Sequence, residues 1–82
     1  MAKVVIPIDV AKVFSNGEAE HFVRGDNLRT LLKNLDSSHP GMKGRLESGF
    51  AVAIDGQIYQ DWFIEEINPD SEVHFIPAVE GG

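Results

Sequence analysis

A chain of 82 residues without cysteine can build one small domain, and it can hold neither a disulfide nor a thiolate-bound metal ion. Seven basic and 13 acidic residues give a net charge of −6, and Lys and Arg form no cluster that would bind nucleic acid. No apolar run approaches the length of a membrane span. We therefore expect a cytoplasmic protein, monomeric when free, with no nucleic-acid or membrane partner.

The first predicted strand covers residues 3–9, K-V-V-I-P-I-D, where β-branched side chains dominate. Pro7 cannot donate a backbone hydrogen bond, and it therefore favours an edge position in the sheet. Alternation along the strand predicts that Val4, Ile6 and Ile8 face inward and that Pro7 faces outward.

A turn signal, Ser-Asn-Gly at residues 15–17, follows this strand. Residues 18–24 then alternate, with His21 and Val23 on one face and Phe22 on the other. The two segments predict an antiparallel hairpin.

The clearest helix signal covers about residues 27–38. Asp26 or Asn27 can cap its start, and the segment from Ser38 to Gly41, which contains Pro40, ends it. Four apolar residues recur at i, i+3, i+4 and i+7, the spacing of one buried helical face. They are Leu28, Leu31, Leu32 and Leu35.

The second half of the chain predicts three strands with short connections. The strands cover residues 50–55, 57–60 and 72–77. A helical turn at 42–47 precedes them, and an Asp-Gly turn at 55–56 joins the first two. A helical turn or core-packed loop at 61–67 and a turn at 68–71 lead to the third. On the last strand, Val73 and Phe75 should face inward and His74 and Ile76 outward. The sum is an α+β fold, in which a mixed sheet of four or five strands has one main helix on one face.

The chain closes with Gly81-Gly82 directly after an apolar segment. Glycine loses the most conformational freedom on ordering, so this pair is a poor anchor for a strand or helix. A backbone without side chains can instead enter a narrow channel and present its carboxylate there. We expect residues 1–77 to form the domain and residues 78–82 a flexible tail, which can reach about 17 Å when extended.

Two segments carry a family resemblance: F-A-V-A-I-D-G-Q-I-Y at residues 50–59 and N-P-D-S-E-V-H-F-I-P-A-V-E-G-G at residues 68–82. They resemble the ubiquitin-like β-grasp sulfur carriers. That family includes the small subunit of molybdopterin synthase, the thiamine-pathway carrier and a carrier serving cysteine synthesis. The resemblance implies a β-grasp fold.

The resemblance also implies a carrier, not an enzyme, and a carrier that binds no cofactor of its own. An E1-like adenylyltransferase would use ATP to activate the carboxylate of Gly82, next to Gly81, and a sulfur donor would convert it to a thiocarboxylate. A sulfur-accepting enzyme would then take the sulfur. That enzyme would be of the molybdopterin synthase large-subunit, thiazole synthase or cysteine synthase type. The length and Pro77 favour the molybdopterin and cysteine branches, with the molybdopterin type first.

A docking surface at the base of the tail is a further expectation. Pro7 and Ile76 are predicted to form a small apolar patch there, continued toward the partner by the threading segment of Pro77, Ala78, Val79 and Glu80. The position before Gly-Gly is often small in the family, so Glu80 is a departure that bears on the choice of partner.

Two other classes of protein stay open at this point. A ubiquitin-like modifier would join Gly82 to lysines through the same adenylate, and a β-grasp interaction module would use no chemistry at its end. No enzyme active site is indicated, since the three histidines are scattered and the serines lie in turn-like settings.

Overall fold

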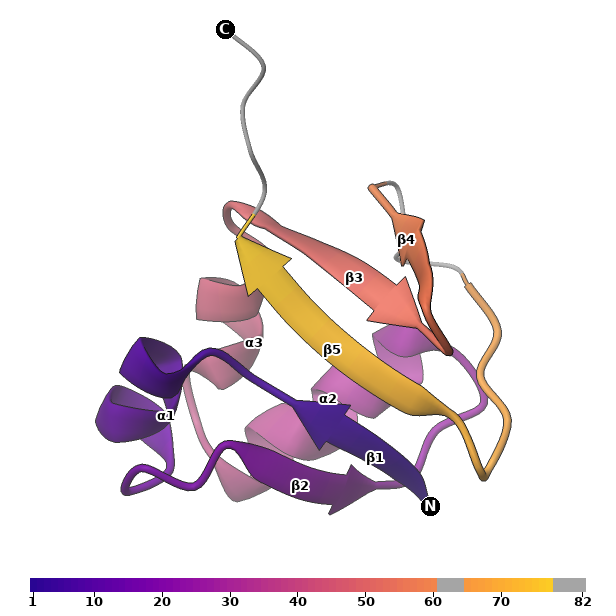
Figure 1. The fold of residues 1–82 in the computed structure, drawn as a ribbon. Coiled ribbons are helices and arrows are strands. Elements are labelled where there is room, and N and C mark those ends of the chain that lie inside the picture. The colour runs from indigo at the N-terminus through magenta and orange to yellow at the C-terminus, as the bar shows by residue number, and fades with distance from the viewer. Residues whose placement is uncertain (61–64, 78–82) are drawn as a thin grey trace, which may run out of the picture.

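The computed structural model describes residues 1–60 and 65–77. Within them, five strands form one sheet in the order β2-β1-β5-β3-β4 (Figure 1). The strands are β1 (Ala2–Val5), β2 (Glu20–Val23), β3 (Phe50–Ile54), β4 (Gln57–Tyr59) and β5 (Glu72–Pro77), and the helices are α1 (Ile8–Phe14), α2 (Leu28–Ser38) and α3 (Met42–Leu46). β1 and β5 run parallel and the other neighbours antiparallel. The predicted α+β class is confirmed.

The first strand is shorter than predicted, and the chain forms a helix where the strand was expected to continue. Strand β1 ends at Val5, and Pro7 is the N-cap residue of α1 with φ −60° and ψ 146°. The proline ring fixes φ near the helical value and removes an N–H that a helix start leaves unpaired. Ile8, predicted to face inward, is 57% exposed because it begins a helix that buries Val10 and Ala11 instead.

The edge position inferred from Pro7 is also wrong. Strand β1 lies between β2 and β5, and Pro7 follows the strand, so its missing N–H interrupts no ladder. The turn at residues 15–17 is present, with Asn16 and Gly17 both at positive φ, but it ends α1 and does not join two strands. The antiparallel pairing of β1 and β2 is confirmed, and a helix takes the place of the predicted tight hairpin.

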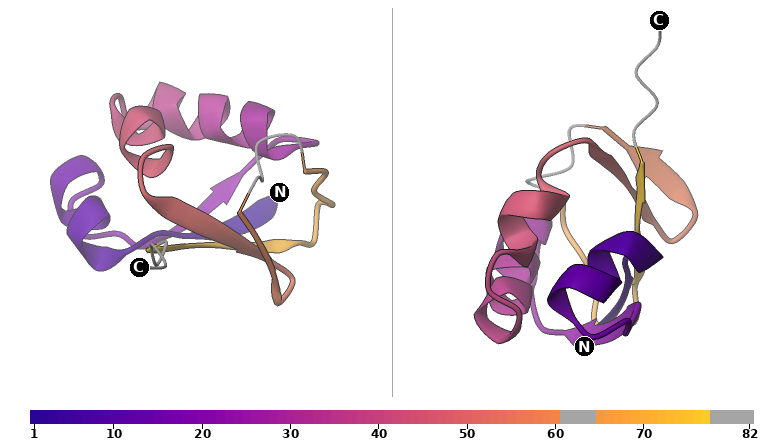
Figure 2. Two further views of the ribbon diagram at one scale, coloured as in Figure 1. Left: turned by 90° about the horizontal axis from the view of Figure 1, so that it is seen from above. Right: turned by 90° about the vertical axis from the view of Figure 1, so that its left-hand side faces the viewer.

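Helix α2 is the main helix that the leucine spacing predicted. The Asn27 side chain accepts a hydrogen bond from the Thr30 N–H at 2.8 Å and caps its start. Its four predicted leucines are buried. They pack on the inner face of the sheet, which Val4, Val52 and Phe75 supply. Figure 2 shows α2 and α3 on one face of the sheet, with the other face uncovered.

The predicted strands of the second half are confirmed. Asp55 and Gly56 join β3 to β4 with φ 49° and 88°, the positive values of the favoured hairpin turn. The Asp55 carboxylate accepts from the Glu72 N–H at 2.9 Å, which ties this turn to the start of β5. Ile67 is buried against the core, as expected for the segment 61–67, whereas residues 61–64 lie outside the described residues.

None of the helices in residues 1–60 and 65–77 has the length and apolar character that crossing a membrane demands. The same residues bring together no group of three or more side chains of the kinds that ligate metal ions.

Candidate functional site

The strand that leads to Gly81-Gly82 is an interior strand of the sheet. β5 pairs with β1 on one side, as far as His74 opposite Val5, and with β3 on the other, as far as Pro77 opposite Phe50. We call Ile76 and Pro77 the tail root. The pairing of Ile76 and Pro77 with β3 fixes the position of the tail root at the end of the sheet. Residues 78–82, which hold the predicted reactive group, lie outside the described residues.

The two faces of β5 are those that alternation predicted. Val73 and Phe75 are buried under the helices, whereas His74 and Ile76 are half-buried on the face that no helix covers. The inward side chains anchor the strand in the core. The outward side chain of Ile76 leaves an apolar group one residue before Pro77.

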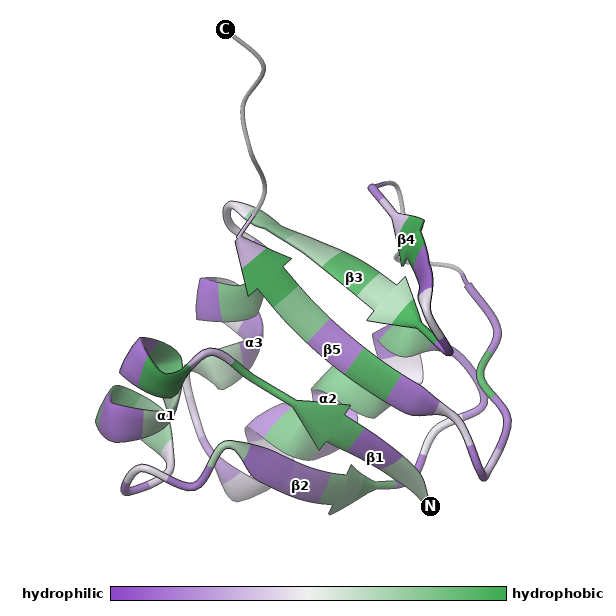
Figure 3. Ribbon diagram, in the orientation of Figure 1, coloured by the Kyte–Doolittle hydropathy of each residue, from purple (hydrophilic) through white to green (hydrophobic). Residues whose placement is uncertain are grey.

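Pro7 and Ile76 lie at the same end of the sheet. β1 and β5 run parallel with Val5 opposite His74, and Pro7 and Ile76 each stand two residues further along. Both side chains are half-buried, and Pro77 is exposed. Their role in docking stays a prediction. Figure 3 shows that β3 and the end of β5 nearest the tail root are largely hydrophobic.

The uncovered face of the sheet carries two further apolar side chains, Phe22, whose face strand alternation predicted, and Ile58, which no prediction named. Ile58 on β4 is 61% exposed and pairs with Ala53, and Phe22 on β2 is 66% exposed. The face on which Ile58 lies can be predicted by counting outward from the Asp55-Gly56 turn, because residues directly opposite in a hairpin share a face. Large exposed apolar side chains on one face are a feature of binding surfaces when they form a patch.

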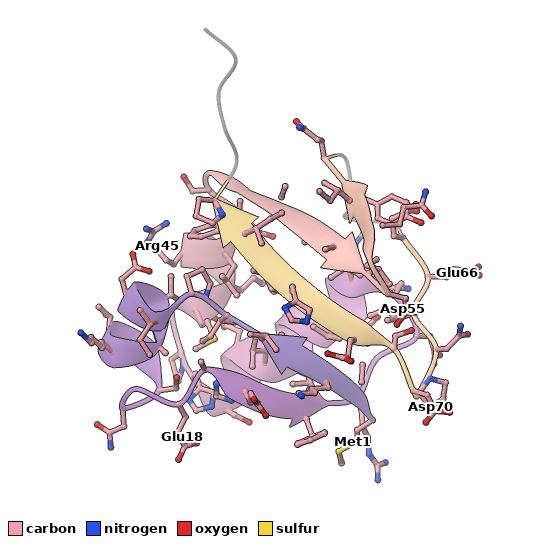
Figure 4. The ribbon with its side chains drawn as sticks, in the orientation of Figure 1. Met1, Glu18, Arg45, Asp55, Glu66 and Asp70 are labelled. Carbon is pink, nitrogen blue, oxygen red and sulfur yellow. The ribbon has the colours of Figure 1, made fainter. Side chains whose placement is uncertain are left out.

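A basic group stands beside the tail root. The guanidinium of Arg45 lies over the Phe50 ring at 4.9 Å from its centroid, and Phe50 is the residue opposite Pro77. Arg45 also donates a hydrogen bond to the Ser48 carbonyl at 3.3 Å. The labelled acids Asp55, Glu66 and Asp70 lie toward the opposite end of β5 (Figure 4). No local sequence pattern places Arg45 beside the tail root, because its stacking partner lies in another element.

Comparisons with known proteins identify the fold first. The chain is similar to CysO in a crystal structure of the Amycolatopsis orientalis BexX/CysO complex, with a TM-score of 0.86 and 21% identity over 100% of both chains. It is similar to Mycobacterium tuberculosis CysO, described as an antigen, with a TM-score of 0.85 and 18% identity over 96% of this chain and 100% of that one. It is also similar to the small archaeal modifier protein 1 of Methanosarcina acetivorans, with a TM-score of 0.75 and 19% identity over 99% and 95%. The fold is therefore the predicted β-grasp.

The sequence itself gives the family. The model of the ThiS family matches residues 11–82, from within α1 to the last glycine. The chain belongs to the ThiS family, and the predicted membership among the ubiquitin-like sulfur carriers is confirmed. No curated protein matches the sequence.

Proposed function

We propose that this protein carries sulfur as a thiocarboxylate on Gly82. One observation carries the proposal: the family match runs through to residue 82, so it includes the Gly-Gly segment. The sheet supports it, because the interior strand β5 leads into that segment and fixes where it starts. In this proposal residues 1–77 form the domain that partners bind in the cytoplasm, and residues 78–82 are the flexible tail that reaches the partner's reaction centre.

The proposed chemistry has two steps, both of which use the carboxyl group of Gly82. A carboxylate oxygen of Gly82 attacks the α-phosphorus of ATP, pyrophosphate leaves, and an acyl-adenylate forms. A hydrosulfide ion then attacks the acyl carbon, AMP leaves, and loss of the sulfur-bound proton gives a thiocarboxylate. This group is anionic and nucleophilic, as a thiolate is. The carrier supplies position and the partner supplies the catalytic groups.

The proposed partners are an E1-like adenylyltransferase, which uses ATP, and an enzyme that accepts the sulfur. The similar chain in the BexX/CysO structure is bound to another protein, which supports a role exercised in complexes. We propose that the sulfur enters a cofactor or an amino acid. The two CysO structures add support to the cysteine branch, which the length and Pro77 favour together with the molybdopterin branch.

A second candidate function is protein modification. The similarity to small archaeal modifier protein 1 favours it, and the same acyl-adenylate would then react with a lysine amine. Mass spectrometry of intact protein from cells separates the two. A sulfur carrier gains the mass difference between sulfur and oxygen at its C-terminus, whereas a modifier appears in a series of isopeptide adducts. Protein that carries neither change while its pathway is active would contradict both.

Docking at the tail root gives a prediction for Ile76. An Ile76→Glu variant should raise the KM of the activating enzyme for the carrier about tenfold, since a carboxylate would replace half-buried apolar surface beside Pro77. Steady-state kinetics with the purified partner measures this. Val13→Glu is the matched control, because Val13 is 74% exposed and belongs to α1, not to β5. An unchanged KM for Ile76→Glu, or an equal rise for Val13→Glu, would remove the tail root from the docking surface.

A further inference from the structure

Strand β2 presents a free edge at the side of the sheet away from the tail root. It is the first strand in the order β2-β1-β5-β3-β4, so only β1 pairs with it among the described strands. The Ile6 N–H donates to the Ala19 carbonyl at 2.9 Å, and the antiparallel register then alternates. His21 and Val23 therefore bond to β1, and the N–H and C=O groups of Glu20 and Phe22 point away from the sheet.

A groove of about 360 Å³ runs between this edge and helix α2. The residues that line it include Arg24, His21, His39, Asn34 and Ser38, together with the apolar Val23 and Leu35. No Asp or Glu is among the described residues that line it. On a chain with a net charge of −6, the residues that line the groove thus include one permanently charged cation, Arg24, and no carboxylate.

The walls of this β2–α2 groove are held in place by hydrogen bonds and ring contacts. The His21 Nε2–H donates to the Glu18 carbonyl at 2.7 Å, and the His21 and His39 rings meet edge to face at 4.9 Å. The Asn34 amide donates to the Arg24 carbonyl at 2.8 Å, which links α2 to the end of β2. The groove therefore exists before any ligand arrives, which lowers the ordering cost of binding.

We propose that the β2–α2 groove binds an extended acidic segment of a partner protein, which adds a strand to β2. The outward backbone groups of Glu20 and Phe22 would supply the ladder. Residues of the added strand opposite His21 and Val23 share their face and point into the groove, where acidic side chains meet Arg24.

The other face of the added strand has a different requirement. Residues opposite Phe22 lie beside its 66% exposed ring, where apolar side chains fit. The segment that fits best therefore alternates acidic and apolar residues. Strand β1 separates β2 from β5, so this site and the tail root lie on different strands. The proposal is independent of the chemistry at Gly82.

A titration of the isotope-labelled full chain with a short synthetic peptide of alternating Glu and Val tests the proposal. Hydrogen exchange of the Phe22 amide should slow at least about tenfold on binding, because it gains a strand partner. The amides of His21 and Val23 already bond to β1 and should change little. In an added strand, the N–H groups of every second residue point toward β2 and those of the residues between them point to solvent. A peptide N-methylated on the residues that face β2 should fail to bind. A peptide N-methylated on the other residues should bind as the unmethylated peptide does.

Charge variants separate strand addition in this groove from general attraction. Arg24→Ala should weaken binding roughly fivefold. Lys33→Ala removes the same charge from an exposed position of α2 outside the groove lining, and it should have less than about a twofold effect. Three results would overturn the proposal. They are no spectral change at millimolar peptide, equal binding of a peptide with Lys in place of Glu, and saturation without slower exchange at Phe22.

Discussion

A Gly82→Val variant is expected to fold as the wild type does and to lose activation. With the purified activating enzyme, ATP–pyrophosphate exchange should fall at least about a hundredfold, because a branched Cβ at the last residue displaces the carboxylate from the nucleotide. Since residues 78–82 are proposed to be a tail beyond the domain, we expect the midpoint of thermal unfolding not to move. A fall in the ATP–pyrophosphate exchange rate with an unchanged unfolding midpoint would show that the substitution affects activation and not folding.

Gly44→Val is the control for this variant. A Cβ at Gly44 would meet no other atom within 4 Å, and φ there is not positive, so the same side chain fits in the folded domain. It should leave both the exchange rate and the unfolding midpoint near the wild-type values. If Gly82→Val were adenylated at the normal rate, the argument that the end must thread a narrow channel would be wrong.

The second large effect is expected in the core. Leu32→Ala should lower the free energy of unfolding by about 3 kcal/mol, because the side chain is 0% exposed and its removal leaves a cavity between α2 and the sheet. A small domain has only about 5–15 kcal/mol of stability, so this is a large share of the total. Urea denaturation measures the change as a lower midpoint with an unchanged slope.

The neighbouring position supplies the control for the core prediction. Lys33 is exposed on the same helix, and Lys33→Ala should change the free energy of unfolding by less than about 0.5 kcal/mol. A loss below about 1 kcal/mol for Leu32→Ala would mean that α2 does not hold the core in the way the burial of its leucines indicates.

The elements that the sequence predicts best have a repeated local signal. The leucines of α2 recur over about two turns, and each one is buried. On β5, period-two alternation assigned Val73 and Phe75 to the core, and both are buried. The Asp55-Gly56 turn has a conformation that few other residue pairs adopt. In these places the local pattern and the tertiary packing require the same residues.

Helix α1 could not be predicted in this way, because its signal is short and mixed. It has seven residues and buries only Val10 and Ala11 within them, which is too few for a helical period to emerge. The β-branched residues before Pro7 extend the appearance of a strand. The proline itself is compatible with both a strand edge and a helix start, and the position of β1 inside the sheet decides between them.

The candidate site likewise has parts that a local sequence pattern predicts and parts that only tertiary contacts define. The predicted reactive residue rests on a local motif, and the end of β5 that precedes it was predicted correctly. The stacking of Arg45 on Phe50 and the groove between β2 and α2 join residues from different elements. Such contacts depend on the order of strands in the sheet, which no local pattern in this chain specifies.

The most direct test of the central claim is to locate the adenylate. The protein is mixed with its activating enzyme and ATP without a sulfur donor, and the C-terminal peptide is fragmented in a mass spectrometer. We expect AMP on the carboxyl group of Gly82 and on no side chain. AMP on another residue, or an unmodified C-terminus while the enzyme consumes ATP in response to the protein, would contradict the account.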